Sequence, residues 1–254
     1  YEKFFDVFGI NLKWGSYEDY GMRKDSLKDL ILFKTANQDK YQTLKEYVEK
    51  MPEGQDVIYY ASGKTKASIL AQPQMDTIKS KGYDVLVLTD DIDEFMIMVL
   101  NEYDGKKFKS INSSDLDLLS EDEKKAIDDL KEEKKSLLDT MKEALGDKVK
   151  DVCLSKRLTD SPVCLVSGDG LSFEMERVMN QMPMGNEVKA DKILEINPHH
   201  EIFKAIESVY EKDLYSVAKY AELLYSQALL IEGMKLEDPI KFSNLMCELM
   251  IKSS

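Results

Sequence analysis

Apolar residues follow two different periods along this chain of 254 residues. In residues 1–50 they recur at helical spacing, so we expect short helices there with little strand character. From residue 57 onward, short runs rich in β-branched residues alternate with helical stretches. The expected strands are Val57–Ala61, Val85–Leu88 and Phe108–Ile111, with helices over Lys64–Lys81 and Ile92–Tyr103 between them. This alternation predicts right-handed crossovers and a small, three-stranded, largely parallel sheet.

A polar connector at Ser113–Leu119 predicts a domain boundary, which divides the chain into residues 1–119 and 120–254. Ser120 and Glu123 have the spacing of a capping box, and Gly146 is a typical helix stop. We therefore expect one long helix between them. Its narrow apolar stripe and mixed charges are typical of a solvated linker helix.

The second half mixes strands and helices, so the fold class we expect is α+β / α/β. Two apolar runs, Val149–Leu154 and Val163–Val166, flank a polar connector that contains Pro162, which predicts strand, connector, strand. A helix rich in methionine follows at Leu171–Met182, then a strand at Ile193–Ile196. We expect Asn197 to cap the next helix, with Pro198 in its first turn.

The last two helices carry long apolar seams. One seam has the three-and-four spacing of packed helices, and Gly233 should end that helix. The final helix should begin at Asp238-Pro239. Two such amphipathic helices cover each other only in part, so we expect two copies to pair in a four-helix bundle. The expected interface residues are Leu214, Val217, Ala221, Leu224, Ala228, Ile231, Phe242, Leu245, Met246 and Leu249.

The net charge and the composition limit the classes of partner that this chain can bind. Lys and Arg number 35 against 48 Asp and Glu, a net charge of −13, which argues against nucleic acid and anionic membranes. No apolar run approaches the ~20 residues of a membrane helix. Cys153, Cys164 and Cys247 show no C-x-x-C spacing and lie in apolar runs. Buried free thiols in a reducing cytoplasm are the better interpretation.

Three sequence patterns resemble parts of phosphate-binding or metal-binding sites, but each lacks residues that such a site needs. Gly63-Lys64-Thr65 follows a strand as a phosphate-binding loop would, but Ile58 stands where that loop needs its first glycine. The acidic residues Asp90–Glu94 suit a helix N-terminus as well as a metal. His199 and His200 have no third ligand nearby. We therefore expect no catalytic residue, no metal and no cofactor in this chain.

Several segments together resemble the 90-kDa heat-shock chaperone family. The most specific is Ser155–Val166 (SKRLTDSPVCLV), which resembles the start of the C-terminal domain in its bacterial members. The other matching segments follow the family's order along the chain: Val57–Gly63, Gly82–Glu94, Lys192–His199, Leu223–Leu230 and Leu236–Pro239.

The resemblance implies a fragment that covers the end of the middle domain and the C-terminal dimerisation domain. The family's ATP and Mg²⁺ site lies in an N-terminal domain that is absent here, so we expect no ATP hydrolysis by this chain. The implied function is that of a cytoplasmic, homodimeric stress-response chaperone, which binds unfolded or partly folded client proteins.

The resemblance also assigns client contacts. In the helix rich in methionine, pattern alone does not separate a core face from an adaptable binding face; the family uses this helix to contact clients. A second contact region lies at the end of the middle domain, where Phe95 replaces the bacterial tryptophan and Met98 an asparagine. The implied client-binding residues are Glu94, Phe95, Met98, Leu171, Met175, Val178 and Met179.

Two alternatives remain open from the sequence. One is a dimerisation scaffold that has no affinity for clients. The other is a nucleotide-binding enzyme similar to P-loop proteins, built around Gly63-Lys64-Thr65.

Overall fold

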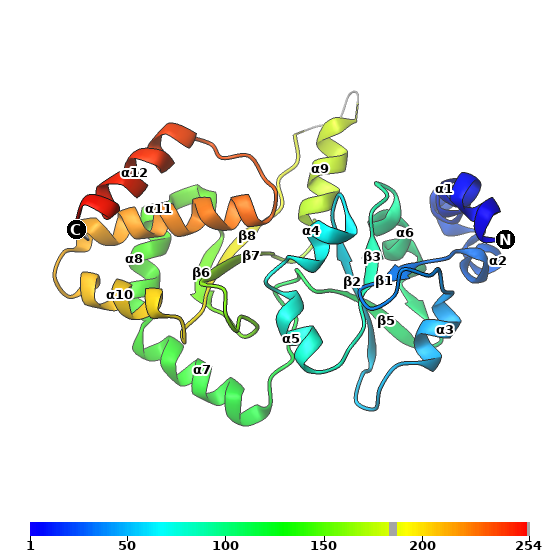
Figure 1. The fold of residues 1–254 in the computed structure, drawn as a ribbon, viewed down its shortest axis with the longest axis horizontal. Coiled ribbons are helices and arrows are strands. Elements are labelled where there is room, and N and C mark those ends of the chain that lie inside the picture. Colours follow the sequence, from blue (N-terminus) through cyan, green and yellow to red (C-terminus); the bar gives the residue numbers. More distant parts are fainter. Residues whose placement is uncertain (183–186, 253–254) are drawn as a thin grey trace. The chain divides into compact units, whose positions relative to one another are not determined.

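The computed structural model describes residues 1–182 and 187–252, which form two compact units (Figure 1). Unit 1 comprises Tyr1–Leu116 together with Leu171–Ala190, and unit 2 comprises Asp117–Gly170 together with Asp191–Ser254. The segment that carries the methionine-rich helix thus lies in unit 1, although it comes from the second half of the chain. The division at residue 119 stays a prediction about which parts of the chain fold independently.

Unit 1 is built on a five-stranded mixed sheet in the order β1-β3-β2-β5-β4. Its three central strands are parallel, as the sequence predicts. The expectation of three strands was incomplete, because a short antiparallel strand pairs with each outer edge. The strands are β1 (Lys34–Thr35), β2 (Val57–Ser62), β3 (Leu86–Leu88), β4 (Glu102–Tyr103) and β5 (Lys106–Ser110).

The helices of unit 1 differ from the prediction mainly at the N-terminus. There one helix of 20 residues, α1 (Glu2–Gly21), replaces the expected short ones, and it kinks where Asp19 and Tyr20 adopt positive φ. The expected helix over 64–81 is broken around Pro73, as that proline predicts. The remaining elements are α2 (Lys24–Leu27), η1 (Lys28–Leu30), α3 (Leu44–Glu49), α4 (Lys66–Leu70), α5 (Met75–Ser80), α6 (Asp93–Leu100) and α9 (Phe173–Gln181).

The core of unit 1 lies between the sheet, α1 and α3. Ile58 and Leu86 from neighbouring parallel strands are fully buried, together with Leu44 from α3. Phe5 of α1 packs against the same core. This shared core fixes α1 beside α6, the helix that follows β3.

Unit 2 contains a three-stranded sheet in the order β6-β8-β7, with β6 (Asp151–Leu154), β7 (Val163–Ser167) and β8 (Lys192–Ile196). β8 pairs in parallel with β6 and antiparallel with β7. The connector between β6 and β7 is held by buried polar groups. Glu195 forms an ion pair with Arg157 at 3.0 Å and accepts a hydrogen bond from Ser155 at 2.7 Å. Burial of these groups together satisfies charges that would otherwise destabilise the core.

Helices surround this sheet: α7 (Glu121–Glu133), α8 (Lys135–Leu145), η2 (Gly146–Lys148), α10 (Glu201–Tyr210), α11 (Leu214–Ile231) and α12 (Pro239–Lys252). The expected single helix before Gly146 is divided at Lys134, whose backbone leaves the helical region. The capping box of Ser120 and Glu123 is present, and Gly146 ends α8 with positive φ.

The cap of α10 differs from the prediction. His200 is its N-cap residue, and the His200 side chain accepts a hydrogen bond from the backbone of Ile202. Asn197 instead donates two hydrogen bonds to the backbone oxygens of Thr159 and Ser161. Its amide thereby holds the connector between β6 and β7.

Candidate functional site

An apolar cluster joins α6 to α9 within unit 1, although the two helices are far apart in the sequence. Ile92 and Phe95 from the α6 region pack against Met175 and Val178 from α9, and all four side chains are buried. We name these four residues the α6–α9 cluster. Helical spacing explains the pairing on α9, since Met175 and Val178 are three residues apart and share one face.

Polar contacts surround the α6–α9 cluster. The hydroxyl of Ser172, which also caps α9, donates a hydrogen bond to Glu94. Arg177 forms ion pairs with Asp91 and with Glu174. Burial raises the pKa of Glu94, because desolvation penalises its carboxylate, although the hydrogen bond from Ser172 favours the charged form.

The structure brings the predicted client-binding residues together but covers several of them. Phe95, Met175 and Val178 lie inside the α6–α9 cluster, and Glu94 is buried beside it. Leu171 and Met179 are half-buried at its edge. Met98, one turn along α6 from Phe95, is 59% exposed. The methionine-rich helix is therefore packed against α6 through Met175 and Val178.

Tyr17 is a member of this site that the sequence analysis missed. Its ring packs edge-to-face on Phe95, with ring centroids 5.8 Å apart, and it lies half-buried against the α6–α9 cluster. The signal was present as an aromatic residue on the first helix. No periodicity within one helix could show that this helix meets α6.

The predicted dimer residues on α11 have two different surroundings. Val217, Ala221, Leu224 and Ala228 are buried within unit 2, where α11 packs against α8, α10 and β7. Leu214, in contrast, is 59% exposed. Ile231 is half-buried, as are Phe242, Leu245 and Leu249 on α12.

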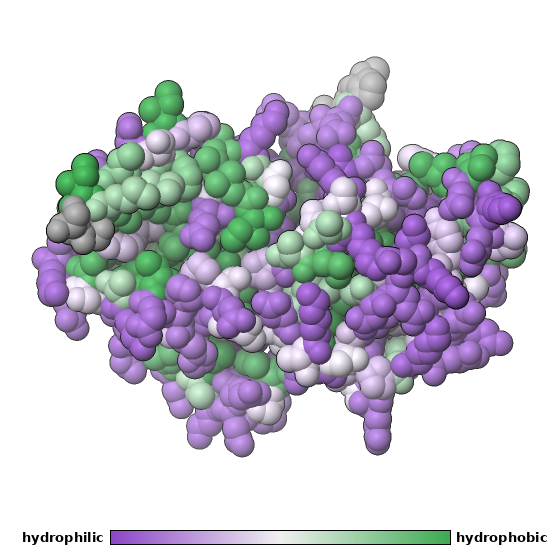
Figure 2. Space-filling model, viewed as in Figure 1, coloured by the Kyte–Doolittle hydropathy of each residue, from purple (hydrophilic) through white to green (hydrophobic). Residues whose placement is uncertain are grey.

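Hydrophobic side chains gather over α11 and α12 in the face that Figure 2 shows. On α12, Met246 is 39% exposed and Ile240 is 74% exposed. α12 is tied to α11 by an ion pair between Lys219 and Glu248. Unit 2 thus keeps apolar surface on the outer side of its last helix.

Gly63-Lys64-Thr65 lies beside a pocket of about 550 Å³ between α1 and the ends of β2 and β3. The Gly63 amide donates to the carbonyl of Leu88, so it is engaged in the sheet. The Thr65 hydroxyl caps α4. Lys66 is paired with Asp39, and the buried Lys13 with Asp90. These contacts explain Gly63 as a strand end and Thr65 as a helix cap, and the nucleotide-binding alternative is not favoured.

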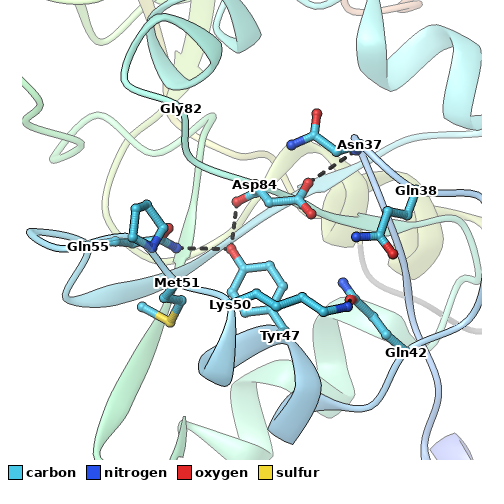
Figure 3. Close-up of a pocket in the computed structure, with 10 residues that line it drawn as sticks. Asn37, Gln38, Gln42, Tyr47, Lys50, Met51, Gln55, Gly82 and Asp84 are labelled. Atoms are coloured by element: carbon cyan, nitrogen blue, oxygen red, sulfur yellow. Dashed lines mark hydrogen bonds between the residues drawn. The ribbon is translucent and has the colours of Figure 1, made fainter.

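A smaller polar pocket of about 190 Å³ lies between α3 and the start of β3 (Figure 3). The Tyr47 hydroxyl donates to the backbone oxygen of Asp84 and accepts from the Gln55 amide. Lys50 donates to Gln42. Burial raises the pKa of Tyr47, so its phenol stays protonated at neutral pH. The residues drawn in Figure 3 mainly satisfy one another, which indicates a structural role.

The described residues include no group of three or more His, Cys, Asp and Glu side chains that could hold a metal ion. Cys164 is buried, and burial raises the pKa of Cys153 to about 12, which leaves that thiol unreactive at neutral pH. Cys153 is half-buried and Cys247 is exposed on α12, so the expectation that all three thiols are buried is confirmed for Cys164 and wrong for Cys247. Within the part of the chain described, no helix has the length and apolar character needed to cross a membrane.

Comparison with known proteins gives one consistent result. The family model described as "Hsp90 protein" matches residues 1–254. Chaperone protein HtpG of Clostridium botulinum (strain Langeland) is 47% identical over 250 residues, which cover 98% of this chain and 40% of that protein. The proteins of the same name from Bacillus subtilis and Oceanobacillus iheyensis are 45% and 46% identical over 251 residues, which cover 99% of this chain and 40% of each. The chain thus spans about 40% of the length of the curated relatives it matches.

Proposed function

The chain belongs to the Hsp90 protein family, and we propose that it is the part of a heat-shock chaperone that binds client proteins and pairs with a second copy. Residues 1–119 would form the end of the middle domain, and residues 120–254 the C-terminal dimerisation domain. The clients would be unfolded or partly folded proteins in the cytoplasm.

The observation that supports client binding is the assembly of the α6–α9 cluster with exposed Met98 beside it. Six of the seven predicted client residues lie in this cluster, at its edge or directly beside it; Met98 is one helical turn from Phe95. Methionine is flexible and polarizable, so an exposed methionine next to an apolar cluster can accept side chains of different shapes. The proposed binding surface is therefore Met98 with the half-buried Leu171 and Met179.

An aggregation assay tests this proposal. The chain should slow the aggregation of a thermally unfolding enzyme in proportion to its concentration. Met98→Ser should weaken this protection, because it removes the most exposed apolar group of the surface. Leu30→Ser is the matched control, since Leu30 is also exposed (44%) but is not part of the proposed binding surface. Absence of protection by the unchanged chain would favour the scaffold alternative.

We further propose that ATP and Mg²⁺ act in parts of the intact chaperone outside residues 1–254, so that this chain alone does not hydrolyse ATP. The engaged Gly63 amide and the capping role of Thr65 support this. Phosphate release should stay at background when the chain is incubated with ATP and Mg²⁺. A turnover that survives further purification and disappears in Lys64→Ala would contradict the proposal.

A further inference from the structure

Trp14 is the single tryptophan of the sequence and lies on α1, in unit 1. Its neighbours Lys13 and Ser16 are buried, whereas Trp14 is 38% exposed. Aromatic side chains offer large apolar areas for contact, so a partly exposed tryptophan is a candidate binding group.

A line of edge-to-face rings connects Trp14 to the α6–α9 cluster. The Trp14 and Tyr17 rings lie 6.0 Å apart at 71°, and Tyr17 and Phe95 lie 5.8 Å apart at 67°. Both geometries are the preferred arrangement of aromatic pairs. Since Phe95 belongs to the α6–α9 cluster, Trp14 is the outer end of an apolar line that runs from the surface of α1 into that cluster.

Tyr17, Leu171 and Met179 are half-buried side chains that pack against the same α6–α9 cluster, so α1 borders the cluster that carries the proposed client surface. Burial increases along this line, from exposed Trp14 through half-buried Tyr17 to buried Phe95. Tryptophan and tyrosine are the residues most enriched among energetically dominant interface contacts, because they offer a large rigid area at little entropic cost. Such a surface suits an extended, unfolded segment that presents aliphatic or aromatic side chains.

We propose that Trp14 and Tyr17 extend the client surface onto α1, and that Trp14 packs directly against apolar side chains of an unfolded client. This inference rests on the proposed client-binding function. It adds two residues from a helix that no predicted client contact includes.

The single tryptophan makes the test direct. The probe is a synthetic peptide without tryptophan, in which leucine and phenylalanine alternate with serine. Binding is measured independently by the fluorescence anisotropy of a fluorescein-labelled copy. On addition of unlabelled peptide, Trp14 emission should shift to the blue and its quenching by acrylamide should fall. Trp14→Ala should weaken peptide binding several-fold with little change in melting temperature.

Phe8→Ala is the matched control, because Phe8 is an exposed aromatic residue on the same helix (50%) that pairs with Phe4 rather than with Tyr17. Its binding should equal that of the unchanged chain. If the peptide binds while Trp14 emission and quenching stay constant, the inference is wrong and the proposed function stands. If anisotropy shows no binding at all, both are wrong. The emission measurement uses the unchanged chain, so it decides the matter even if Trp14→Ala fails to fold.

Discussion

Lys13 places a positive charge inside unit 1, where α1 meets the start of α6. Its ammonium group lies 2.8 Å from a carboxylate oxygen of Asp90 and 2.7 Å from one of Asp93. Burial disfavours the charged lysine, but the two carboxylates outweigh that effect and raise the pKa of Lys13. The ion pairs therefore hold α1 against α6, and with it the surface that carries Trp14 and Phe95.

Lys13→Met should destabilise unit 1 strongly, because it leaves the carboxylate of Asp93 buried without its counter-charge. Removal of one partner from a buried pair costs ~3–5 kcal/mol. The measurement is urea unfolding followed by Trp14 fluorescence, which reports unit 1 alone. Lys28→Met is the control, because the pair of Lys28 with Asp25 is on the surface and such pairs contribute ~0–1 kcal/mol. Equal losses in the two variants would contradict the proposed role of Lys13.

We expect the stability of unit 1 to depend on pH through Glu94, which is buried beside the α6–α9 cluster. Desolvation raises its pKa in the folded chain above the ordinary value of 4.5, so the native state binds more protons than the unfolded state above that pH. Stability contributed by Glu94 is complete below pH 4.5 and is lost as pH rises through the folded pKa. Glu94→Gln should therefore lose less stability than the unchanged chain when pH is raised from 4.5. Urea midpoints, measured by Trp14 fluorescence across this range, test the difference.

Glu46 offers a control of the same residue type with the opposite sign. Hydrogen bonds from Thr43, which Glu46 accepts in the capping box of α3, lower the pKa of Glu46. Its contribution is present above the ordinary pKa and lost as pH falls. Glu46→Gln should thus flatten the loss of stability on the acidic side of the profile, whereas Glu94→Gln should flatten the loss of stability above pH 4.5. The same pH profile in both variants would show that burial of Glu94 is not the cause.

Some single-residue roles could be predicted and others could not. The capping box of Ser120 and Glu123 depends on residues three apart, so local spacing was enough. The prediction of Asn197 as the cap of α10 was wrong, because two suitable residues, Asn197 and His200, lie close together. The choice between them depends on the connector at Thr159 and Ser161, which takes up the Asn197 amide. That contact joins segments almost forty residues apart and leaves no local pattern.

Helix α9 shows the same limit for a whole element. Its methionine-rich face was equally compatible with a core and with a binding surface, because both uses require the same residues at the same spacing. Only the position of α6 decides between them, and α6 lies far away in the sequence. The structure assigns Met175 and Val178 to the packed side and leaves Met98 exposed.

Substitutions in the α6–α9 cluster should therefore separate stability from binding. Met175→Ala should destabilise unit 1 by ~2 kcal/mol or more, the usual cost of removing a buried methionine side chain. Met98→Ala should change stability by less than ~0.5 kcal/mol, as expected for an exposed position, while it weakens client binding. Urea unfolding by Trp14 fluorescence and the aggregation assay measure the two effects. A Met175→Ala chain as stable as the unchanged one would show that α9 does not dock on α6 in solution.

The three central strands of unit 1 were predicted, whereas the two short edge strands were missed. The central strands β2 and β3 carry continuous apolar runs because they are covered on both faces. The edge strands β1 and β4 contain two residues each, too few to show an alternating period. Each of them forms because a neighbouring strand supplies hydrogen-bond partners. The residues of the short strand itself do not show that this neighbour is present.

The seam of α11 illustrates a different ambiguity. Its spacing of three and four correctly indicates a packed helix, but the pattern does not say which chain covers the seam. Within unit 2, residues such as Val217 and Ala221 are covered by the same chain. A partner copy would therefore meet mainly the residues left accessible on α11 and α12, such as Leu214 and Met246.

At the scale of the whole molecule we propose that the chain pairs with a second copy, and that α12 provides the contact surface. A symmetric pair would place the outer face of α12 against the same face of a second copy. An interface of ~1,600 Å² is a usual size for a stable complex. Apolar side chains gather over α11 and α12 on the side shown in Figure 2, and this is the surface proposed for the contact.

Met246→Glu tests this pairing more selectively than a change at a half-buried position. Met246 is 39% exposed in the single chain, so a glutamate there can remain hydrated in the monomer. In the proposed interface the same charge would be buried without a partner, at a cost of several kcal/mol. Sedimentation equilibrium at micromolar concentration should give a dimer for the unchanged chain and a monomer for Met246→Glu. Asn244→Glu, at another exposed position of α12, should stay dimeric because two residues along a helix correspond to about 200°, so its side chain lies on the opposite side from Met246. An unchanged chain that remains monomeric would refute the pairing, and monomers in both variants would point to a general effect of negative charge on α12.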